Sequence, residues 1–142
     1  EGMNLFMGKA KCATCHFTPI FNGTVPPSYS KTEHEVIGTP QDASGKKISP
    51  DLGRYLYNQM PQLKGAFKTP TVRNAAITAP YMHNGVFKTL EEVVDFYNKG
   101  GGKGLGLNVE NQTLPFDELK LTKNEERDLV AFMKTLTDKR YE

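Results

Sequence analysis

The chain has 142 residues, a length typical of one globular domain and too short for two full domains. Its hydrophobic fraction is 37%, and 13 glycines bring the apolar share to a normal value for folded proteins, which argues against a disordered chain. The net charge is only +2, so the composition predicts neither a nucleic-acid partner nor binding to an anionic membrane. No apolar run reaches the roughly 18 residues of a membrane span.

The first part of the chain predicts short helices and long loops. An apolar stripe predicts a short helix over residues 1–16. Residues 17–50 contain five prolines and three glycines without a periodic pattern, so we expect a loop there. A loop of this length is unusual in a compact domain unless it wraps something. A short helix is expected over residues 51–60, followed by a second irregular stretch over 61–88.

Two capping boxes predict the starts of two further helices. Thr89 is followed by Glu92, and Thr122 by Glu125, so each pair can satisfy free backbone donors at a helix start. The first helix should end at the glycine run 100–106, which we expect to be a loop. The second helix should bury an apolar face formed by Leu129, Val130, Phe132, Met133 and Leu136. Strand signals are weak, so the predicted fold class is all-α, with few short helices and long ordered loops.

One pentapeptide near the N-terminus contains both cysteines of the chain and a histidine. Cys12-Ala13-Thr14-Cys15-His16 matches the attachment signature of c-type haem. On a helical turn the two thiols lie on one side and can form thioethers with one edge of a porphyrin. The adjacent histidine can then bind the iron from the same turn. The sequence therefore predicts one covalent haem c, attached through Cys12 and Cys15, with His16 as the proximal iron ligand.

The cysteine pair could also form a structural zinc site, a thioredoxin-type redox pair or a plain disulfide. Zinc needs two more ligands at paired spacing, and only His34 and His83 remain, far apart in the sequence. A thioredoxin-type pair needs a βαβ context, which the expected elements do not supply. Haem attachment also accounts for His16, and a haem would give the long loops a surface to wrap.

The ligand on the other face of the iron stays open on spacing alone. Met3 and Met7 belong to the proximal segment, where they are either core or partner-facing. Met133 lies on the expected buried stripe, and His34 lies in a charged loop at 31–35. The remaining candidates are Met60, Met82, His83 and Tyr97, and an open or water-bound iron is also compatible.

Several further segments closely resemble the C-terminal haem domain of bacterial di-haem cytochrome c peroxidases and their MauG-type relatives. These segments read DLGR at 51–54, FKTPTVRNAAITAPYMHNG at 67–85 and TLEEVVDFYNKGG at 89–101, and the closing helix at 121–136 fits as well. The resemblance runs from Cys12 to about residue 137. It implies a single c-type cytochrome domain over residues 1–142, without the N-terminal haem domain of the family members.

The resemblance also implies a distal iron ligand. Peroxidases of the family carry a methionine at the position that corresponds to Tyr97, and MauG-type members carry a tyrosine there. Tyr97 is therefore the expected distal ligand, with Met82 as the alternative. A phenolate favours Fe(III), whereas a thioether raises the reduction potential, so a tyrosine ligand implies a low potential.

Further roles follow from the resemblance for residues around the haem. Arg73 and Lys68 are expected to contact the haem propionates, since a carboxylate favours a charge-assisted partner. His83 corresponds to a family residue close to the haem. The main-chain carbonyls of Thr78 and Pro80 correspond to calcium ligands, whose remaining protein ligand comes from the absent N-terminal domain.

The function implied by the resemblance is a haem c electron-transfer domain. It would relay electrons to or from a partner haem or redox protein, and a larger assembly containing it would be a peroxidase-type oxidoreductase. A self-standing mono-haem carrier and a peroxidase with an open haem site are the alternatives. The sequence has no tryptophan, the residue that family members place between their two haems. Because this haem attachment is extracytoplasmic in bacteria, we expect a periplasmic or otherwise exported protein whose leader has been removed.

Overall fold

The computed structural model describes residues 1–141. This part of the chain contains the helices α1 (Gly2–Met7), α2 (Leu90–Asn98), α3 (Gly101–Gly104) and α4 (Lys123–Thr135). Single 3-10 turns occur at η1 (Cys12–Thr14), η2 (Arg54–Leu56), η3 (Pro61–Leu63), η4 (Ala75–Ile77) and η5 (Lys139–Tyr141). Two short strands, β1 (His34–Glu35) and β2 (Phe67–Lys68), complete the regular structure, and loops make up most of the rest.

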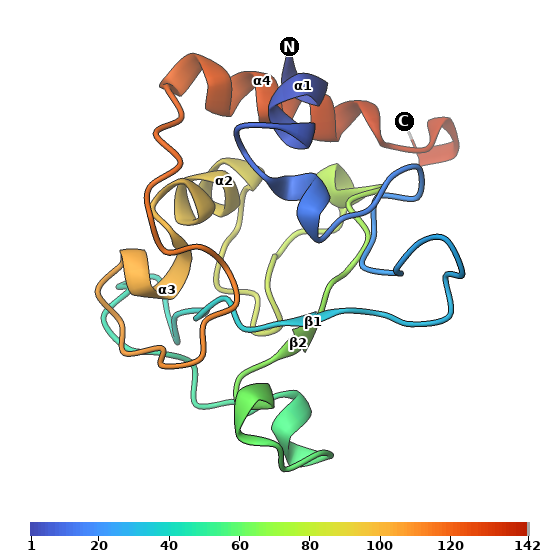
Figure 1. Cartoon of the computed structure of the whole chain (residues 1–142). Coiled ribbons are helices and arrows are strands. Elements are labelled where there is room, and N and C mark those ends of the chain that lie inside the picture. The colour runs from blue at the N-terminus through green and yellow to red at the C-terminus, as the bar shows by residue number, and fades with distance from the viewer. Residues whose placement is uncertain (142) are drawn as a thin grey trace.

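The prediction of an all-α fold is wrong, because the chain forms a small β-sheet. β1 and β2 pair antiparallel, with His34 opposite Lys68 and Glu35 opposite Phe67. This ribbon crosses the lower half of the molecule, below the helices (Figure 1). Strands of two residues are too short to show an alternating hydrophobic pattern, so sequence periodicity does not reveal them.

The two predicted capping boxes are both present. The backbone nitrogen of Glu92 donates to the hydroxyl of Thr89 over 3.2 Å, and the Glu92 carboxylate accepts from the Thr89 nitrogen at 3.0 Å. Thr122 and Glu125 make the same reciprocal pair at 3.3 and 2.7 Å. These contacts confirm the predicted starts of α2 and α4.

Three helix predictions need correction. The N-terminal helix ends at Met7, because Gly8 departs from helical geometry and Lys11 is left-handed with φ 56°. Only the 3-10 turn η2 forms within residues 51–60. The glycine run contains the short helix α3 instead of only a loop. A side chain is excluded from Gly102, since a Cβ there would lie 2.4 Å from the carbonyl oxygen of Gly38.

The main core lies where α1 and α2 pack on α4 (Figure 1). Phe6 is 1% exposed, and its ring centroid lies 5.4 Å from that of Phe132 in an edge-to-face arrangement. At the surface of the same contact, the ammonium of Lys9 lies 2.7 Å from a carboxylate oxygen of Glu125. The contact between α1 and α4 therefore joins both ends of the described chain, and η1 packs next to α1.

A smaller core lies between the long loops and contains Val36, Ala66 and Val109. The prediction that Met133 belongs to the core is confirmed, because this side chain is 7% exposed. None of the helices within residues 1–141 combines the length and the apolar character that crossing a membrane requires.

Candidate functional site

His16 is held in one protonation form by a backbone carbonyl. Its ring nitrogen Nδ1 lies 2.9 Å from the oxygen of Pro70. A carbonyl oxygen only accepts, so Nδ1 carries the proton and Nε2 keeps its lone pair. Burial lowers the pKa of His16, which favours the neutral ring at neutral pH. A neutral imidazole that donates through one nitrogen and leaves the other free is the arrangement expected of a metal-binding histidine.

The two cysteines are free thiols that are not activated as nucleophiles. Burial raises the pKa of Cys12 to about 12. The pKa of Cys15 is also raised, first by burial and then by the negative charges of Glu35 and Glu33. A thioredoxin-type pair needs a lowered thiol pKa, so this environment does not favour dithiol redox chemistry. It is compatible with cysteines that end as uncharged thioethers.

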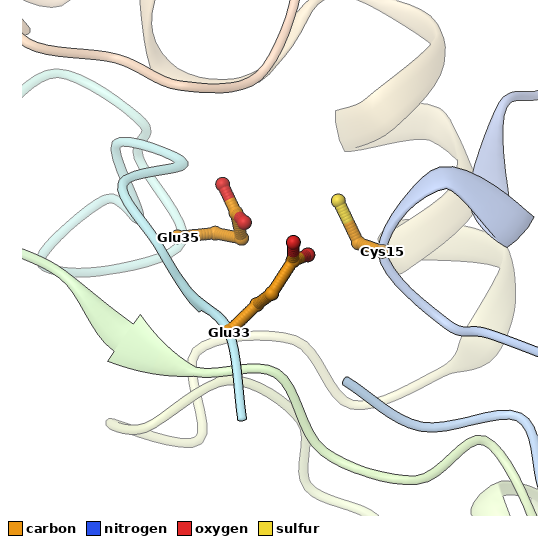
Figure 2. Close-up of side chains that lie close together, drawn as sticks. All are labelled: Cys15, Glu33 and Glu35. Atoms are coloured by element: carbon orange, nitrogen blue, oxygen red, sulfur yellow. The ribbon is translucent and has the colours of Figure 1, made fainter. Parts of the chain in front are cut away.

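A cluster of three possible metal ligands lies beside the attachment segment. Figure 2 shows the side chains of Glu33, Glu35 and Cys15 extending into one space from two segments of the chain. Their carboxylate oxygens and sulfur lie within 4.8 Å of one another. No other cluster of three such side chains occurs within residues 1–141, and this one includes neither Cys12 nor a histidine. The arrangement therefore offers no Cys₂His₂ zinc site.

The two glutamates were missed by sequence reasoning, which placed them in a charged surface loop at 31–35. In the structure, this loop runs into β1, and Glu33 and Glu35 flank His34. Residues two apart on an extended chain point to the same face. The i, i+2 spacing of the two acids indicates that both side chains lie on one face of the segment. It points to a cluster with Cys15 only when the position of Cys15 in the fold is known.

Tyr97 lies on α2 with its side chain partly buried. Burial raises its pKa strongly, and the nearby thiols of Cys12 and Cys15 raise it further. Its hydroxyl makes no hydrogen bond with any residue in the described part of the chain. The buried side-chain oxygen without a partner in the described residues belongs to Thr69, so the Tyr97 hydroxyl is accessible and reaches open space near Cys12 and Cys15. A free, accessible phenol at this place is compatible with an iron ligand.

The other distal candidates are less available. The ring of His83 stacks on Phe67 with centroids 3.7 Å apart, and its Nε2 lies 2.9 Å from the hydroxyl of Ser49. Met60 is 45% exposed between η2 and η3. Met82 is half-buried in a turn, with a positive φ of 68°.

The expected propionate partners lie in different surroundings. A guanidinium nitrogen of Arg73 donates to the carbonyl of Pro19 over 3.2 Å, and the group lies 5.8 Å above the ring of Phe21. Lys68 is exposed and lines an open cavity of about 320 Å³ together with Arg54. Arg73 is thus partly committed to the loop after the attachment segment, whereas Lys68 is not.

The expected calcium ligands lie in an exposed segment after η4. Thr78 and Pro80 are both exposed, and the hydroxyl of Thr78 donates to the carbonyl of Ala75 over 3.5 Å. Within residues 1–141 no cluster of three acidic, cysteine or histidine side chains includes this segment. Main-chain oxygens are the ligands that the segment itself offers.

Comparison with known proteins gives extensive similarity over almost the whole chain, although no protein-family model matches it. Cytochrome-c peroxidase IdrP1 of Pseudomonas sp. (strain SCT) is 39% identical over 96% of this chain and 39% of its own length. The methylamine utilization protein MauG of Methylorubrum extorquens is 38% identical over 96% of this chain and 33% of its own length. The crystal structure of a MauG-like protein associated with microbial copper homeostasis matches with a TM-score of 0.77 and 31% identity, over 97% of this chain and 46% of that one.

These matches define the class as a haem-binding domain of the peroxidase type. The chain belongs to the bacterial cytochrome c peroxidase and MauG family, as the resemblance of its motifs indicates. It spans 39% and 33% of the length of the two curated relatives, so it corresponds to one part of such a protein.

Proposed function

We propose that this chain is a c-type haem domain that relays electrons between a redox protein and a second haem. The observation that carries the proposal is the hydrogen bond from Nδ1 of His16 to Pro70, which leaves Nε2 with a free lone pair directly after the two attachment cysteines. Similarity to cytochrome c peroxidases and MauG proteins over 96% of the chain supports the same assignment.

The proposed roles in attachment follow from the chemistry of each group. Cys12 and Cys15 would hold the haem through thioethers, and His16 would bind the iron through Nε2. Thioether formation removes both thiol protons, so the raised pKa of each thiol no longer matters once attachment is complete. When bound, haem supplies a one-electron Fe(III)/Fe(II) couple.

Tyr97 is proposed as the distal ligand, with Met82 or an open position as the alternatives. Burial disfavours the phenolate of Tyr97, but a bound ferric ion would lower the pKa of the hydroxyl, because a cation reverses the local electrostatics. Tyr97 would then lose its proton on binding and stabilise Fe(III). The resulting low potential suits a domain that gives electrons to a more oxidising haem.

Supporting roles are proposed for residues that surround this pair of ligands. Lys68 and Arg73 would bind the haem propionates. Arg73 has donors left for this contact, because it uses only one guanidinium nitrogen on the carbonyl of Pro19. His83 would be a polar neighbour of the haem, kept in place by Ser49. The carbonyls of Thr78 and Pro80 would contribute to a calcium site completed by another part of the parent protein.

The proposed partners are a redox protein and a second haem domain, and peroxide chemistry is assigned to that second domain. The matched region covers only 39% of the length of the IdrP1 peroxidase, which leaves room for such a domain in the relative. Because thioether haem is attached outside the cytoplasm in bacteria, we propose a periplasmic or otherwise exported location.

The test is to express the chain with an export leader in a bacterium that attaches haem c, and to measure its intact mass. We expect the mass of one haem, retained after denaturation, and a Soret band in the folded protein. A colourless protein with the bare polypeptide mass would overturn the proposal. Peroxide turnover by the purified chain with a one-electron donor would instead favour the open-site peroxidase.

A further inference from the structure

The segment that carries Glu33 and Glu35 is fixed on both sides by its backbone. The nitrogen of Glu33 donates to the carbonyl of Gly23 over 2.9 Å, and the carbonyl of Glu33 accepts from the nitrogen of Thr69 at 3.1 Å. Glu35 pairs with Phe67 in the β-ribbon. This fixed segment therefore keeps both carboxylates within 4.8 Å of the sulfur of Cys15, and the three side chains share one space (Figure 2).

No cation neutralises this pair within residues 1–141, since neither carboxylate takes part in an ion pair there. His34 and Lys68 lie opposite each other on the ribbon, and the alternation of strand side chains puts them on the face away from Glu35. Cys15 is the titratable group placed directly beside the pair, and both acids raise its pKa. The charge of Glu35 also raises the pKa of Tyr97 on α2.

Two carboxylates this close together hold a proton more readily than isolated ones. Burial and the neighbouring charge of Glu35 raise the pKa of Glu33, in that order. This shift agrees with the geometry: both acids lie within 4.8 Å of a sulfur atom and have no basic partner in the described chain.

We infer that the carboxylates of Glu33 and Glu35 place negative charge next to the haem attached at Cys15. This charge lowers the reduction potential of the haem and couples its reduction to the uptake of a proton. The inference rests on the proposed haem attachment. Negative charge beside a haem stabilises Fe(III) relative to Fe(II), because the ferric form carries one more positive charge. The pair thus acts in the same direction as a Tyr97 ligand.

The coupled step balances in charge and atoms. When one electron from the redox protein reduced Fe(III) to Fe(II), the carboxylate pair would bind one proton from solvent. The total charge beside Cys15 would then be unchanged. On oxidation by the acceptor haem, the pair would return the proton to solvent.

The test uses the haem-loaded protein and measures its midpoint potential by spectroelectrochemistry between about pH 5 and 8, the range in which a raised carboxyl pKa is detected. The variants are Glu33→Gln, Glu35→Gln and the double change. Glu118→Gln is the control, because it removes the same charge from an exposed acid outside the cluster. Glu35→Asp keeps the charge and should keep the pH dependence.

We expect the wild-type potential to rise as the pH falls. The double variant should have a reduction equilibrium constant about tenfold larger at neutral pH, which corresponds to ~59 mV for a one-electron couple. Its potential should no longer change with pH, whereas Glu118→Gln should behave like the wild type. Each single variant should lie between these limits.

Identical potentials of the double variant and the wild type at every pH would overturn the inference while leaving the proposed haem attachment intact. This result is expected if both carboxylates turn into solvent when haem is attached. If the double variant does not load haem, a pH-independent wild-type potential would overturn the inference by itself. A wild-type chain without covalent haem would overturn both the proposed function and the inference.

Discussion

Asn98 binds the backbone of Leu121 through both ends of its amide. The oxygen of Asn98 accepts from the nitrogen of Leu121 at 2.9 Å, and its nitrogen donates to the Leu121 carbonyl over 3.1 Å. The same nitrogen donates to the carboxylate of Glu126 over 2.8 Å. Since Asn98 follows Tyr97 directly, this amide fixes the end of α2 that carries the proposed distal ligand against the start of α4.

Replacing Asn98 by alanine should therefore lower the free energy of unfolding and leave the position of Tyr97 less well fixed. Unpaired backbone groups at Leu121 cost about 1–3 kcal/mol in the free energy of unfolding. Urea unfolding of the haem protein measures this loss. Asn108→Ala is the matched control, since Asn108 is exposed and its side chain makes no hydrogen bond in the described residues. Equal stability of the two variants would contradict the role given to Asn98.

Changing Tyr97 tests the distal ligand directly. Tyr97→Met should raise the midpoint potential substantially while haem attachment persists, because a thioether stabilises Fe(II) better than a phenolate. Electron paramagnetic resonance of the ferric protein should change at the same time. Tyr81→Phe serves as the control, since the Tyr81 hydroxyl donates to the carbonyl of Ala75 over 2.7 Å. An unchanged potential in Tyr97→Met would remove Tyr97 as a ligand.

The proposed iron ligand His16 can be tested separately from the proposed covalent attachment. His16→Gly should keep the haem on Cys12 and Cys15 but lose the low-spin visible spectrum, and added imidazole should restore it. His83→Gln should leave the spectrum unchanged, because His83 is engaged with Ser49. A low-spin spectrum in His16→Gly without imidazole would show that another residue binds this face of the iron.

Phe6 is expected to stabilise the proximal side through packing. Its ring is 1% exposed and lies 6.4 Å from the ring of His16. Phe6→Ala should lower the free energy of unfolding by about 3–5 kcal/mol, as is usual for a buried phenylalanine. Met3→Ala on the same helix should change it by less than about 0.5 kcal/mol, because Met3 is 53% exposed. Denaturant midpoints compare the two variants.

Acid should release His16 from the iron only at a pH below the ordinary titration range of histidine. Protons and iron compete for Nε2, so falling pH favours release. Burial lowers the pKa of His16 from 6.5, which means that the unfolded chain takes up this proton more readily than the folded one. Ligation and stability should therefore both be lost as the pH falls, and the visible spectrum should report it. Phe6→Ala exposes the ring and should move the transition to higher pH.

Local signals were sufficient where a contact lies within one turn of the chain. The capping boxes at Thr89 and Thr122 are such contacts, and they correctly located the starts of α2 and α4. The attachment motif is equally local. The β-ribbon was missed because its stability comes from pairing His34 with Lys68, far away in the sequence. No periodic pattern marks such a contact.

Tertiary contacts also explain the other differences. Glycine is a weak helix former, so the run at 100–106 predicted a loop. α3 forms there because Gly102 packs directly against Gly38, and its nitrogen donates to the carbonyl of Ile37 over 2.9 Å. In the sequence, Glu33 and Glu35 resemble ordinary surface charges, because their proximity to Cys15 is a tertiary contact that only the fold creates.

The packing of α1 on α4 has a consequence for biogenesis. The salt bridge between Lys9 and Glu125 connects segments that are synthesised at nearly opposite ends of the described chain. Until α4 has been synthesised, α1 lacks the surface on which it packs, and the position of the cysteine segment that directly follows α1 is not yet fixed from this side.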